Sequence, residues 1–260
     1  MPAMEYDDAA AERLEAVYLG PDVMAQRKDT LQRLAIKEGE HVLDIGSGPG
    51  FLAEDIAEQT GSSGIVVGVD ISEQMVRRAS SRSNRSWLRY KQADATALPF
   101  DDETFDVVVS TQVAEYVPDI EAFCSEVARL LKPGGRGLIL ATDWDAVCWH
   151  SSNPARMESV LRAFAPHCAD SRLPRTLGAR LRKTGLVLNE VSYFPIINLD
   201  RYEGCYSEMV VPFIMAYVKS QGTVPDNVLQ DWADDLDHLN ACGEHFFSTG
   251  RFSFHISKQP

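Results

Sequence analysis

The stretch that decides the fold is His41–Gly50, read as HVLDIGSGPG. A short apolar run is interrupted by one acid, Asp44, and then meets three glycines at alternate positions, Gly46, Gly48 and Gly50. A buried strand that ends in such a turn and enters a helix, here expected over Phe51–Glu58, presents bare backbone and free N–H groups to a ligand. Because many nucleotide cofactors use loops of this kind, the loop alone does not identify the ligand.

Outward from this loop, strands and helices alternate. Apolar runs predict strands at 41–45, 65–69, 87–91, 105–110 and 137–142, with helices at 51–59, 73–80 and 119–131 between them. Two further strands are expected at 186–197 and 246–256. The sequence therefore predicts an α/β fold with a seven-stranded, mostly parallel, doubly wound sheet. In such sheets ligands bind beyond the carboxyl ends of the strands.

That rule places three acids on one rim, since Asp44, Asp70 and Asp94 each lie at or just after the end of a strand. A carboxylate at Asp70 can accept hydrogen bonds from both hydroxyls of a ribose. A dinucleotide-binding dehydrogenase would carry G-x-G-x-x-G, but the sixth position here is Phe51. Three acids suit a cationic, hydroxyl-rich ligand without phosphate better than a nicotinamide dinucleotide.

Five segments occur in the order VLDIGSGPG, GVDIS, QADATALPF, FDVVVS and LLKPGGRGLI, beginning at Val42. Together they resemble a class I S-adenosylmethionine-dependent methyltransferase with its Rossmann-like fold, most closely the ubiquinone/menaquinone methyltransferase branch that includes many small-molecule enzymes. The resemblance covers roughly Val17 to Asp145. It implies S-adenosyl-L-methionine as the cofactor and S-adenosyl-L-homocysteine as the product.

The resemblance also implies which residues hold the cofactor. The glycine loop would contact its methionine part, Asp70 its ribose, Ile71 and Met75 its adenine ring, and Asp94 with Ala95 the adenine amino group. The segment Ser110–Gln112 would line the sulfonium. The full expected set is Asp44, Gly46, Ser47, Gly48, Gly50, Asp70, Ile71, Met75, Asp94, Ala95, Ser110, Thr111 and Gln112.

Methyl transfer from a sulfonium is an in-line displacement, and a general base helps only where the nucleophile must lose a proton. The candidates for that base are Glu115 and His150, with Asp143 and Asp145 also near the rim. Aromatic and apolar residues expected to bind the acceptor are Tyr18, Tyr116, Trp144, Met209, Phe213 and Tyr217. No metal site is expected, because the five cysteines are scattered and form no CxxC pair.

Three regions are expected along the chain. Residues 1–40 would form helices over the active site, and residues 41–199 with 244–260 the cofactor-binding α/β domain. Residues 200–243 would form a helical cap inserted between the last two strands. Within the cap, a helix is expected over Arg201–Ser220, and Pro212 should kink or break it.

The charge balance narrows the partners. With 25 Lys and Arg against 38 Asp and Glu, the net charge is −13, which argues against nucleic acid. Neither a secretory signal nor an apolar run of membrane-spanning length is present, so we expect a cytoplasmic monomer or homodimer that acts on a small, partly apolar metabolite at O, N or C. The alternatives are a protein of this fold that binds the cofactor without methyl transfer, an RNA methyltransferase, and a dinucleotide dehydrogenase.

Overall fold

The computed structural model describes residues 8–260, so residues 1–7 of the expected N-terminal region lie outside the described part. The strands are β1 (His41–Ile45), β2 (Ile65–Asp70), β3 (Leu88–Gln92), β4 (Phe105–Thr111), β5 (Leu131–Thr142), β6 (Cys148–Trp149), β7 (Val187–Asn198) and β8 (Phe247–Ser257). The helices are α1 (Asp8–Leu19), α2 (Pro21–Leu34), α3 (Phe51–Thr60), α4 (Glu73–Arg82), α5 (Ile120–Leu130), α6 (Pro154–Phe164), α7 (Pro174–Lys183), α8 (Tyr206–Gln221) and α9 (Asp226–Ala241). Three short 3₁₀ helices complete the set: η1 (Ala114–Tyr116), η2 (Trp144–Ala146) and η3 (Ala165–His167).

All eight strands form one sheet in the order β3-β2-β1-β4-β5-β8-β6, with β7 paired to β8. The five strands from β3 to β5 are parallel, whereas β8 runs antiparallel to β5, β6 and β7. The chain builds β1, β2 and β3 outward and then returns to place β4 on the other side of β1. The strand order therefore reverses between β1 and β4, which is where this architecture opens a ligand crevice.

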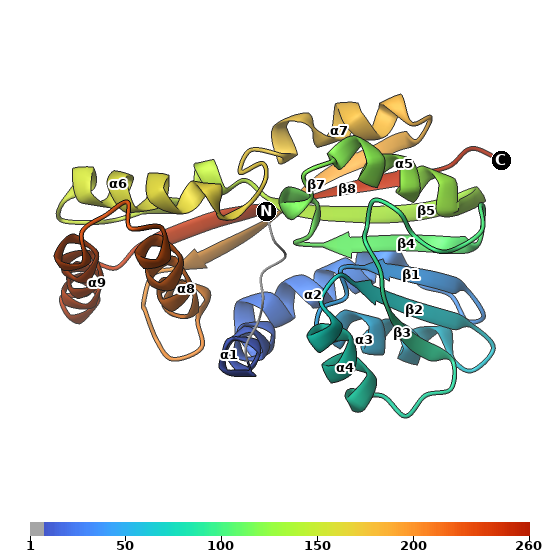
Figure 1. The fold of residues 1–260 in the computed structure, drawn as a ribbon, viewed down its shortest axis with the longest axis horizontal. Helices are drawn as coiled ribbons and strands as arrows, with labels where there is room; N and C mark the ends of the chain where they lie inside the picture. The colour runs from blue at the N-terminus through green and yellow to red at the C-terminus, as the bar shows by residue number, and fades with distance from the viewer. Residues whose placement is uncertain (1–7) are drawn as a thin grey trace.

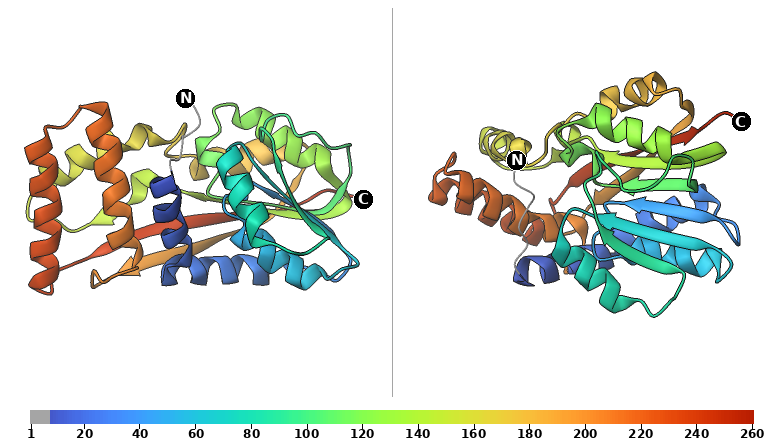
Figure 2. Two further views of the ribbon diagram at one scale, coloured as in Figure 1. Left: turned by 60° about the horizontal axis from the view of Figure 1, so that its bottom comes forward. Right: turned by 45° about the vertical axis from the view of Figure 1, so that its right-hand side comes forward.

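Helices cover both faces of the parallel part of the sheet (Figures 1 and 2). On one face α2 and α3 pack on alternate residues of the strands, such as Val42, Val66 and Val107. On the other face α5 and α7 pack on the intervening residues, such as Leu43 and Val108. Because successive side chains of a strand point to opposite faces, a run that is apolar throughout is buried on both sides, as the sequence predicted.

A third core lies at the far end of β8, where α6, α8 and α9 pack together (Figure 1). Its centre is Trp232, which is completely buried and meets Trp149 edge to face at 5.6 Å between ring centroids. Phe247 at the start of β8 belongs to the same core. The two helices α8 and α9 lie between β7 and β8 in the chain, and they share their core with α6 and with the sheet.

Three details differ from the sequence prediction. The sheet has an eighth strand, the two-residue β6, which is too short to show any periodicity. The strand expected over 137–142 starts earlier, since β5 begins irregularly at Leu131: its pairing with β4 passes from Leu131 to Arg136 while β4 advances only from Phe105 to Val107. The helix expected from Arg201 begins at Tyr206, and it runs through Pro212 as one helix, so of the predicted kink or break the break does not occur.

Candidate active site

The glycine loop after β1 is tied to the end of β2. The amides of Gly46 and Ser47 donate to the carbonyl of Val69 at 2.7 and 2.9 Å, and the amide of Gly48 donates to a carboxylate oxygen of Asp70 at 2.9 Å. Gly46 has φ = 73°, and a Cβ at this position would lie 2.1 Å from a methyl carbon of Val113. Only glycine fits here, so the loop lies directly beside the residues that follow β4.

Asp70 occupies the position expected of a ribose-binding acid. Its second carboxylate oxygen accepts the amide of Ser72 at 2.8 Å, so each oxygen holds one backbone donor. Burial raises the pKa of Asp70, although the amides of Ser72 and Gly48 oppose that shift. An ionised carboxylate can accept about four hydrogen bonds, so two acceptor positions remain for hydroxyl groups.

Asp44 is the buried acid of the site, with 1% of its surface exposed. Its Oδ2 is buried without a hydrogen-bond partner among the described residues. Burial, together with the negative charge of Asp70, raises the pKa of Asp44 to about 7. A buried carboxylate beside a second acid is stabilised by a cation, and the methionine part of S-adenosylmethionine carries an ammonium and a sulfonium. The donor set at this loop therefore fits that cofactor.

The adenine side of the site is more open. Asp94 is exposed, and one of its oxygens accepts from both the amide and the hydroxyl of Thr96, at 2.8 and 2.7 Å. Ala95 beside it is half-buried. Ile71 is 53% exposed just after β2, whereas Met75 is buried in α4. An exposed isoleucine and an exposed carboxylate, each just after a strand, are suited to a flat ring with polar edges.

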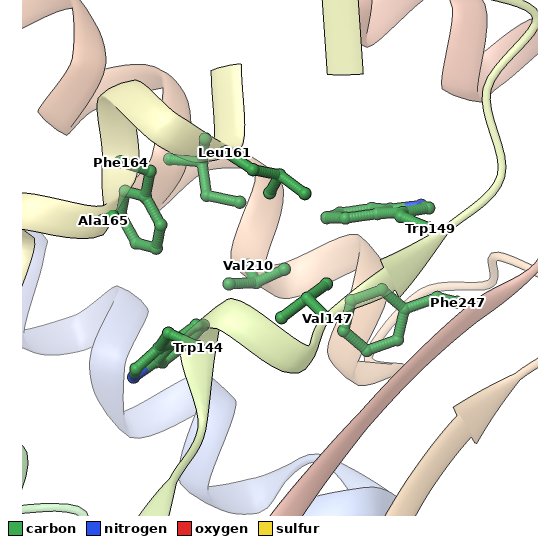
Figure 3. A pocket seen from close by; sticks show the side chains of 9 residues that line it. Trp144, Val147, Trp149, Leu161, Phe164, Ala165, Val210 and Phe247 are labelled. Atoms are coloured by element: carbon green, nitrogen blue, oxygen red, sulfur yellow. The ribbon is translucent and has the colours of Figure 1, made fainter. Parts of the chain in front are cut away.

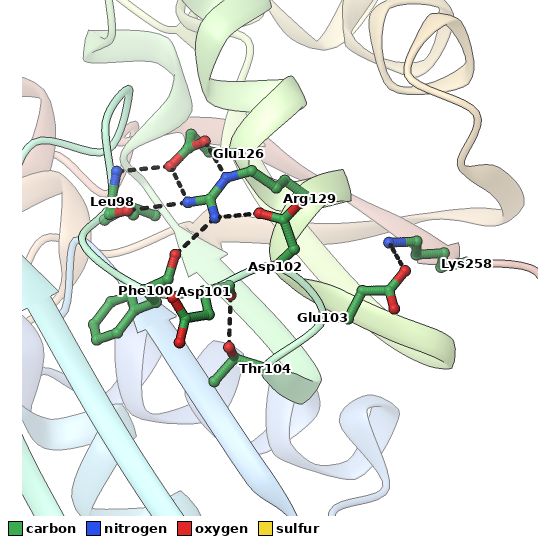
Figure 4. Close-up of polar contacts among 9 residues, drawn as sticks. All are labelled: Leu98, Phe100, Asp101, Asp102, Glu103, Thr104, Glu126, Arg129 and Lys258. Carbon is green, nitrogen blue, oxygen red and sulfur yellow. Dashed lines mark hydrogen bonds and ion pairs between the residues drawn. The ribbon is translucent and has the colours of Figure 1, made fainter.

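The loop that carries Asp94 is held in place by Arg129 of α5 (Figure 4). This guanidinium donates to the carbonyls of Leu98 and Phe100 and pairs with Glu126, whose carboxylate accepts the amide of Leu98 at 2.7 Å. Three of these contacts reach backbone atoms of Leu98 and Phe100, so they fix the path of the loop as well as its side chains.

The end of β4 places three expected residues beside the loop. Ser110 is buried, and its hydroxyl donates to the carbonyl of Ile45 at 2.9 Å. Thr111 follows as the last residue of β4, half-buried. Gln112 has φ = 59°, and its amide oxygen accepts from the hydroxyl of Thr142 at 2.7 Å. A left-handed backbone at a glutamine is uncommon, and here the side chain is held on both polar atoms.

Glu115, one of the two candidate bases, is completely buried behind Gln112. Its Oε1 accepts from Gln112 at 3.2 Å and from the amide of Thr142 at 3.1 Å, while Oε2 has no partner among the described residues. Burial raises the pKa of Glu115 to about 7, although its hydrogen bonds to backbone amides and the positive charge of Arg251 lower the pKa in part. None of its surface is exposed and its hydrogen bonds are with Gln112 and Thr142, so its role as a base stays a prediction.

The other candidate bases lie elsewhere or are paired. His150 follows β6 and is exposed, and its amide donates to the carbonyl of Phe246. Thr142, the last residue of β5, pairs with Arg251 of β8, whereas Trp149 pairs with Phe247, four residues further along β8. His150 therefore follows a residue that lies about 13 Å beyond the end of β5. Asp143 and Asp145 both pair with Arg175, at 2.7 and 2.9 Å. Neither acid is an unpaired base.

The predicted acceptor residues divide into two groups and one outlier. Tyr18 of α1 lies over the glycine loop, with its ring 6.0 Å from Phe51, and Met209 of α8 lies against Gly20. Tyr116, Trp144 and Tyr217 instead gather around His167, at 5.7, 4.8 and 6.1 Å between ring centroids. Phe213 is half-buried on α8, outside this second group.

His167 was not predicted. It is a single histidine in the segment APHCAD, where no neighbour marks it, and its contacts come from elements far apart in the chain. Nearby, Trp144 and Phe164 line a narrow apolar cavity (Figure 3). The other residues along it are Val147, Trp149, Leu161, Ala165, Val210, Ile214 and Phe247.

The described residues contain neither a cluster of metal ligands nor a membrane-spanning helix. Among residues 8–260, no three His, Cys, Asp or Glu side chains gather closely enough to hold a metal ion. Within the same residues, no helix combines the length and the apolar character that crossing a membrane requires.

The sheet, the loop and its acids define a cofactor-binding α/β domain of the doubly wound class. Residues 43–139 match the family described as "Methyltransferase domain". Residues 43–139 therefore carry the methyltransferase domain that this match describes, and S-adenosyl-L-methionine is the cofactor of that domain family.

Similar proteins agree on this class. The chain is 34% identical over 120 residues to a demethylmenaquinone methyltransferase of Lactobacillus johnsonii, covering 45% of this chain and 49% of that protein. It is 33% identical over 143 residues to nocamycin O-methyltransferase of Saccharothrix syringae, covering 54% and 51%. The chain thus spans about half the length of these curated relatives.

Among solved structures, the fold is similar to phosphoethanolamine N-methyltransferase 2 of Haemonchus contortus in complex with S-adenosyl-L-methionine. The TM-score is 0.63 at 21% identity, covering 99% of this chain and 58% of that one. At this identity the likeness concerns the fold alone.

Proposed function

We propose that this protein transfers the methyl group of S-adenosyl-L-methionine to an O, N or C atom of a small, partly apolar metabolite. The observation that carries the proposal is the pair of acids at the glycine loop. The carboxylate of Asp70 accepts the amide of Gly48 and can accept further hydrogen bonds from a ligand. The carboxylate of Asp44 has one buried oxygen without a hydrogen-bond partner among the described residues. This arrangement suits a ligand with a ribose and positive charge, and it disfavours a pyrophosphate.

The chain's own residues then account for the cofactor site. The backbone of Gly46–Gly50 accommodates the methionine part, Asp70 accepts the ribose hydroxyls, and Ile71 with Asp94 receives the adenine. Once bound, the cofactor supplies an activated methyl group on a sulfonium. Gln112, held by Thr142 and Glu115, fixes the wall beside it. Catalysis comes largely from holding the nucleophile in line with the methyl carbon.

The acceptor's size is supported by the aromatic and apolar side chains near this rim. Tyr18 of α1 packs against the third core, and Met209 of α8 lies against Gly20. A net charge of −13 gives no support to a nucleic-acid acceptor. The names of the two curated relatives, demethylmenaquinone methyltransferase and nocamycin O-methyltransferase, also favour a small molecule.

Two measurements test the proposal. Calorimetry should show that S-adenosylhomocysteine binds and NAD does not, and binding of NAD alone would refute the cofactor assignment. A screen of metabolites with methyl-labelled S-adenosylmethionine should then yield a labelled product. Tight binding with no product from a broad library would favour a protein that binds the cofactor without methyl transfer.

We also propose that residues 200–243 act as a cap that retains the acceptor. Removing them is a poor test, because α8 and α9 share a core with Trp149 and Phe247, which deletion would expose. Met209→Ala is sharper, since this side chain joins α8 to Gly20 near the loop. It should raise the KM for the acceptor and leave S-adenosylhomocysteine affinity unchanged, and an unchanged KM would contradict the cap.

A further inference from the structure

His167 lies among four aromatic side chains that come from different parts of the chain. Its ring stacks on Phe164, with 3.8 Å between centroids and an interplanar angle of 11°. Trp144 and Tyr116 meet it edge to face at 4.8 and 5.7 Å, and Tyr217 at 6.1 Å. Three of these four rings are residues that the sequence analysis assigned to the acceptor. The histidine is therefore at the centre of that group.

The hydrogen bonding of His167 fixes which nitrogen carries the proton. Its Nδ1 lies 2.8 Å from the carbonyl oxygen of Phe164. A carbonyl can only accept, so Nδ1 carries the hydrogen and Nε2 keeps a lone pair. This Nε2 is buried without a partner among the described residues. A buried acceptor left unpaired is costly, so it marks a place where a ligand's donor belongs.

The surroundings keep this ring neutral. Burial lowers the pKa of His167 to about 4, and the hydrogen bond to Phe164 only partly opposes that shift. The titratable groups facing it across the ring contacts are the phenols of Tyr116 and Tyr217. At neutral pH, Nε2 is thus a hydrogen-bond acceptor in an aromatic, uncharged setting.

We propose that Nε2 of His167 binds the hydroxyl of a phenol-type methyl acceptor and takes up its proton during methyl transfer. The proposal rests on the proposed function and names the acceptor class for that same site. The aromatic side chains around His167 favour contact with another aromatic ring. The lone pair on Nε2 requires that this ring carry a hydrogen-bond donor, such as a hydroxyl group. Trp144 and Phe164 also line the apolar cavity of Figure 3, so further apolar surface adjoins the ring.

The step balances as follows. The phenol oxygen forms a bond to the methyl carbon, and the carbon–sulfur bond breaks with its electron pair going to sulfur. The sulfonium becomes a neutral thioether. The hydroxyl proton passes to Nε2, which leaves a neutral aryl methyl ether and an imidazolium. A protonated ether is a far stronger acid than imidazolium, so even a weakly basic histidine accepts this proton, and solvent removes it on product release.

Binding of small probes tests the contact without knowledge of the natural acceptor. Phenol and toluene have similar shape, but only phenol carries a donor. In protein saturated with S-adenosylhomocysteine, phenol should bind about three- to tenfold more tightly than toluene, as expected for one hydrogen bond. His167→Phe keeps the stacking on Phe164 and should abolish this preference. His167→Gln, which restores an acceptor oxygen, should recover part of it.

The matched control is His238→Phe, which changes an exposed histidine of α9. It should retain the full preference for phenol. With methyl-labelled S-adenosylmethionine, labelled anisole should form from phenol, and His167→Phe should lower its rate at least tenfold. S-adenosylhomocysteine affinity should stay the same in all variants.

The proposal is overturned if the wild-type protein binds phenol no better than toluene, or if His167→Phe keeps the preference or the rate. These results differ from failure of the proposed function, because that failure would show as absent binding of S-adenosylhomocysteine. A ¹⁵N spectrum adds an independent test, since phenol should shift the Nε2 resonance of His167 and toluene should not.

Discussion

Replacing Asp44 with asparagine should change how stability depends on pH. This carboxylate is buried, with one oxygen unpartnered, and its pKa is raised to about 7 from an ordinary value of 3.8 by burial and by the charge of Asp70. Below pH 3.8 the Asp44 carboxyl is protonated in both the folded and the unfolded state, so its ionisation does not change the free energy of unfolding. Above that, the unfolded state ionises first, and stability falls as pH rises until the folded state ionises near pH 7.

The size of the effect follows from the shift. About three pKa units at 1.4 kcal/mol each give roughly 4 kcal/mol across the whole range. An experiment from about pH 5.5 to pH 8.5 covers only the upper part of the range in which stability falls, so the free energy of unfolding should decrease by roughly 2 kcal/mol. Asp44→Asn removes this titration. Its buried amide has a cost of its own, but that cost does not depend on pH.

The assay is urea unfolding of the ligand-free protein at several pH values. The difference in unfolding free energy between Asp44→Asn and the wild type should shift by roughly 2 kcal/mol in favour of the variant as pH rises. Asp101→Asn, at an exposed acid, serves as the surface control. A constant difference across this range would refute the reasoning. The same variant should weaken S-adenosylhomocysteine binding about tenfold, because a cation loses its buried partner.

Three other changes give sharp expectations. Asp70→Ala should weaken S-adenosylhomocysteine binding at least tenfold by calorimetry, and unchanged affinity would refute its ribose role. Gly46→Ala should lower stability by about 1–3 kcal/mol and impair cofactor binding, because its Cβ would meet Val113 and its φ is positive; wild-type behaviour would contradict the close approach. Trp232→Ala should cost about 3–5 kcal/mol in thermal unfolding, since it is fully buried against Trp149, and a loss below about 1 kcal/mol would show a looser core.

Much of the fold could be predicted from the sequence because its signals are local. The run through Val42 and Leu43, the glycines after it and the acid at Asp70 each follow from a few neighbouring residues. The two-residue β6 could not be seen, because no periodicity exists over two positions. Of the kink or break predicted at Pro212, the break does not occur, because tertiary packing of α8 against α6 and α9 outweighs the loss of one helical hydrogen bond.

The cofactor residues were predicted in the same local way, and their roles remain predictions. The acceptor side was harder, because its residues meet only in three dimensions. Tyr116 and Tyr217 are separated by about a hundred positions, yet both contact His167. A single histidine without a motif gives no signal in one sequence. His150, which looked better placed after a predicted strand, lies beyond the end of β5.

The place of β8 in the sheet has a consequence for synthesis of the chain. Residues 247–257 follow the other seven strands of the described residues in the chain, yet they lie between β5 and β7 and also pair with β6. While residues 247–257 are still inside the ribosome, β5 and β7 have unpaired backbone edges, and the third core lacks Phe247. Open edges pair readily with other chains, so this late stage is when the protein most needs protection from aggregation.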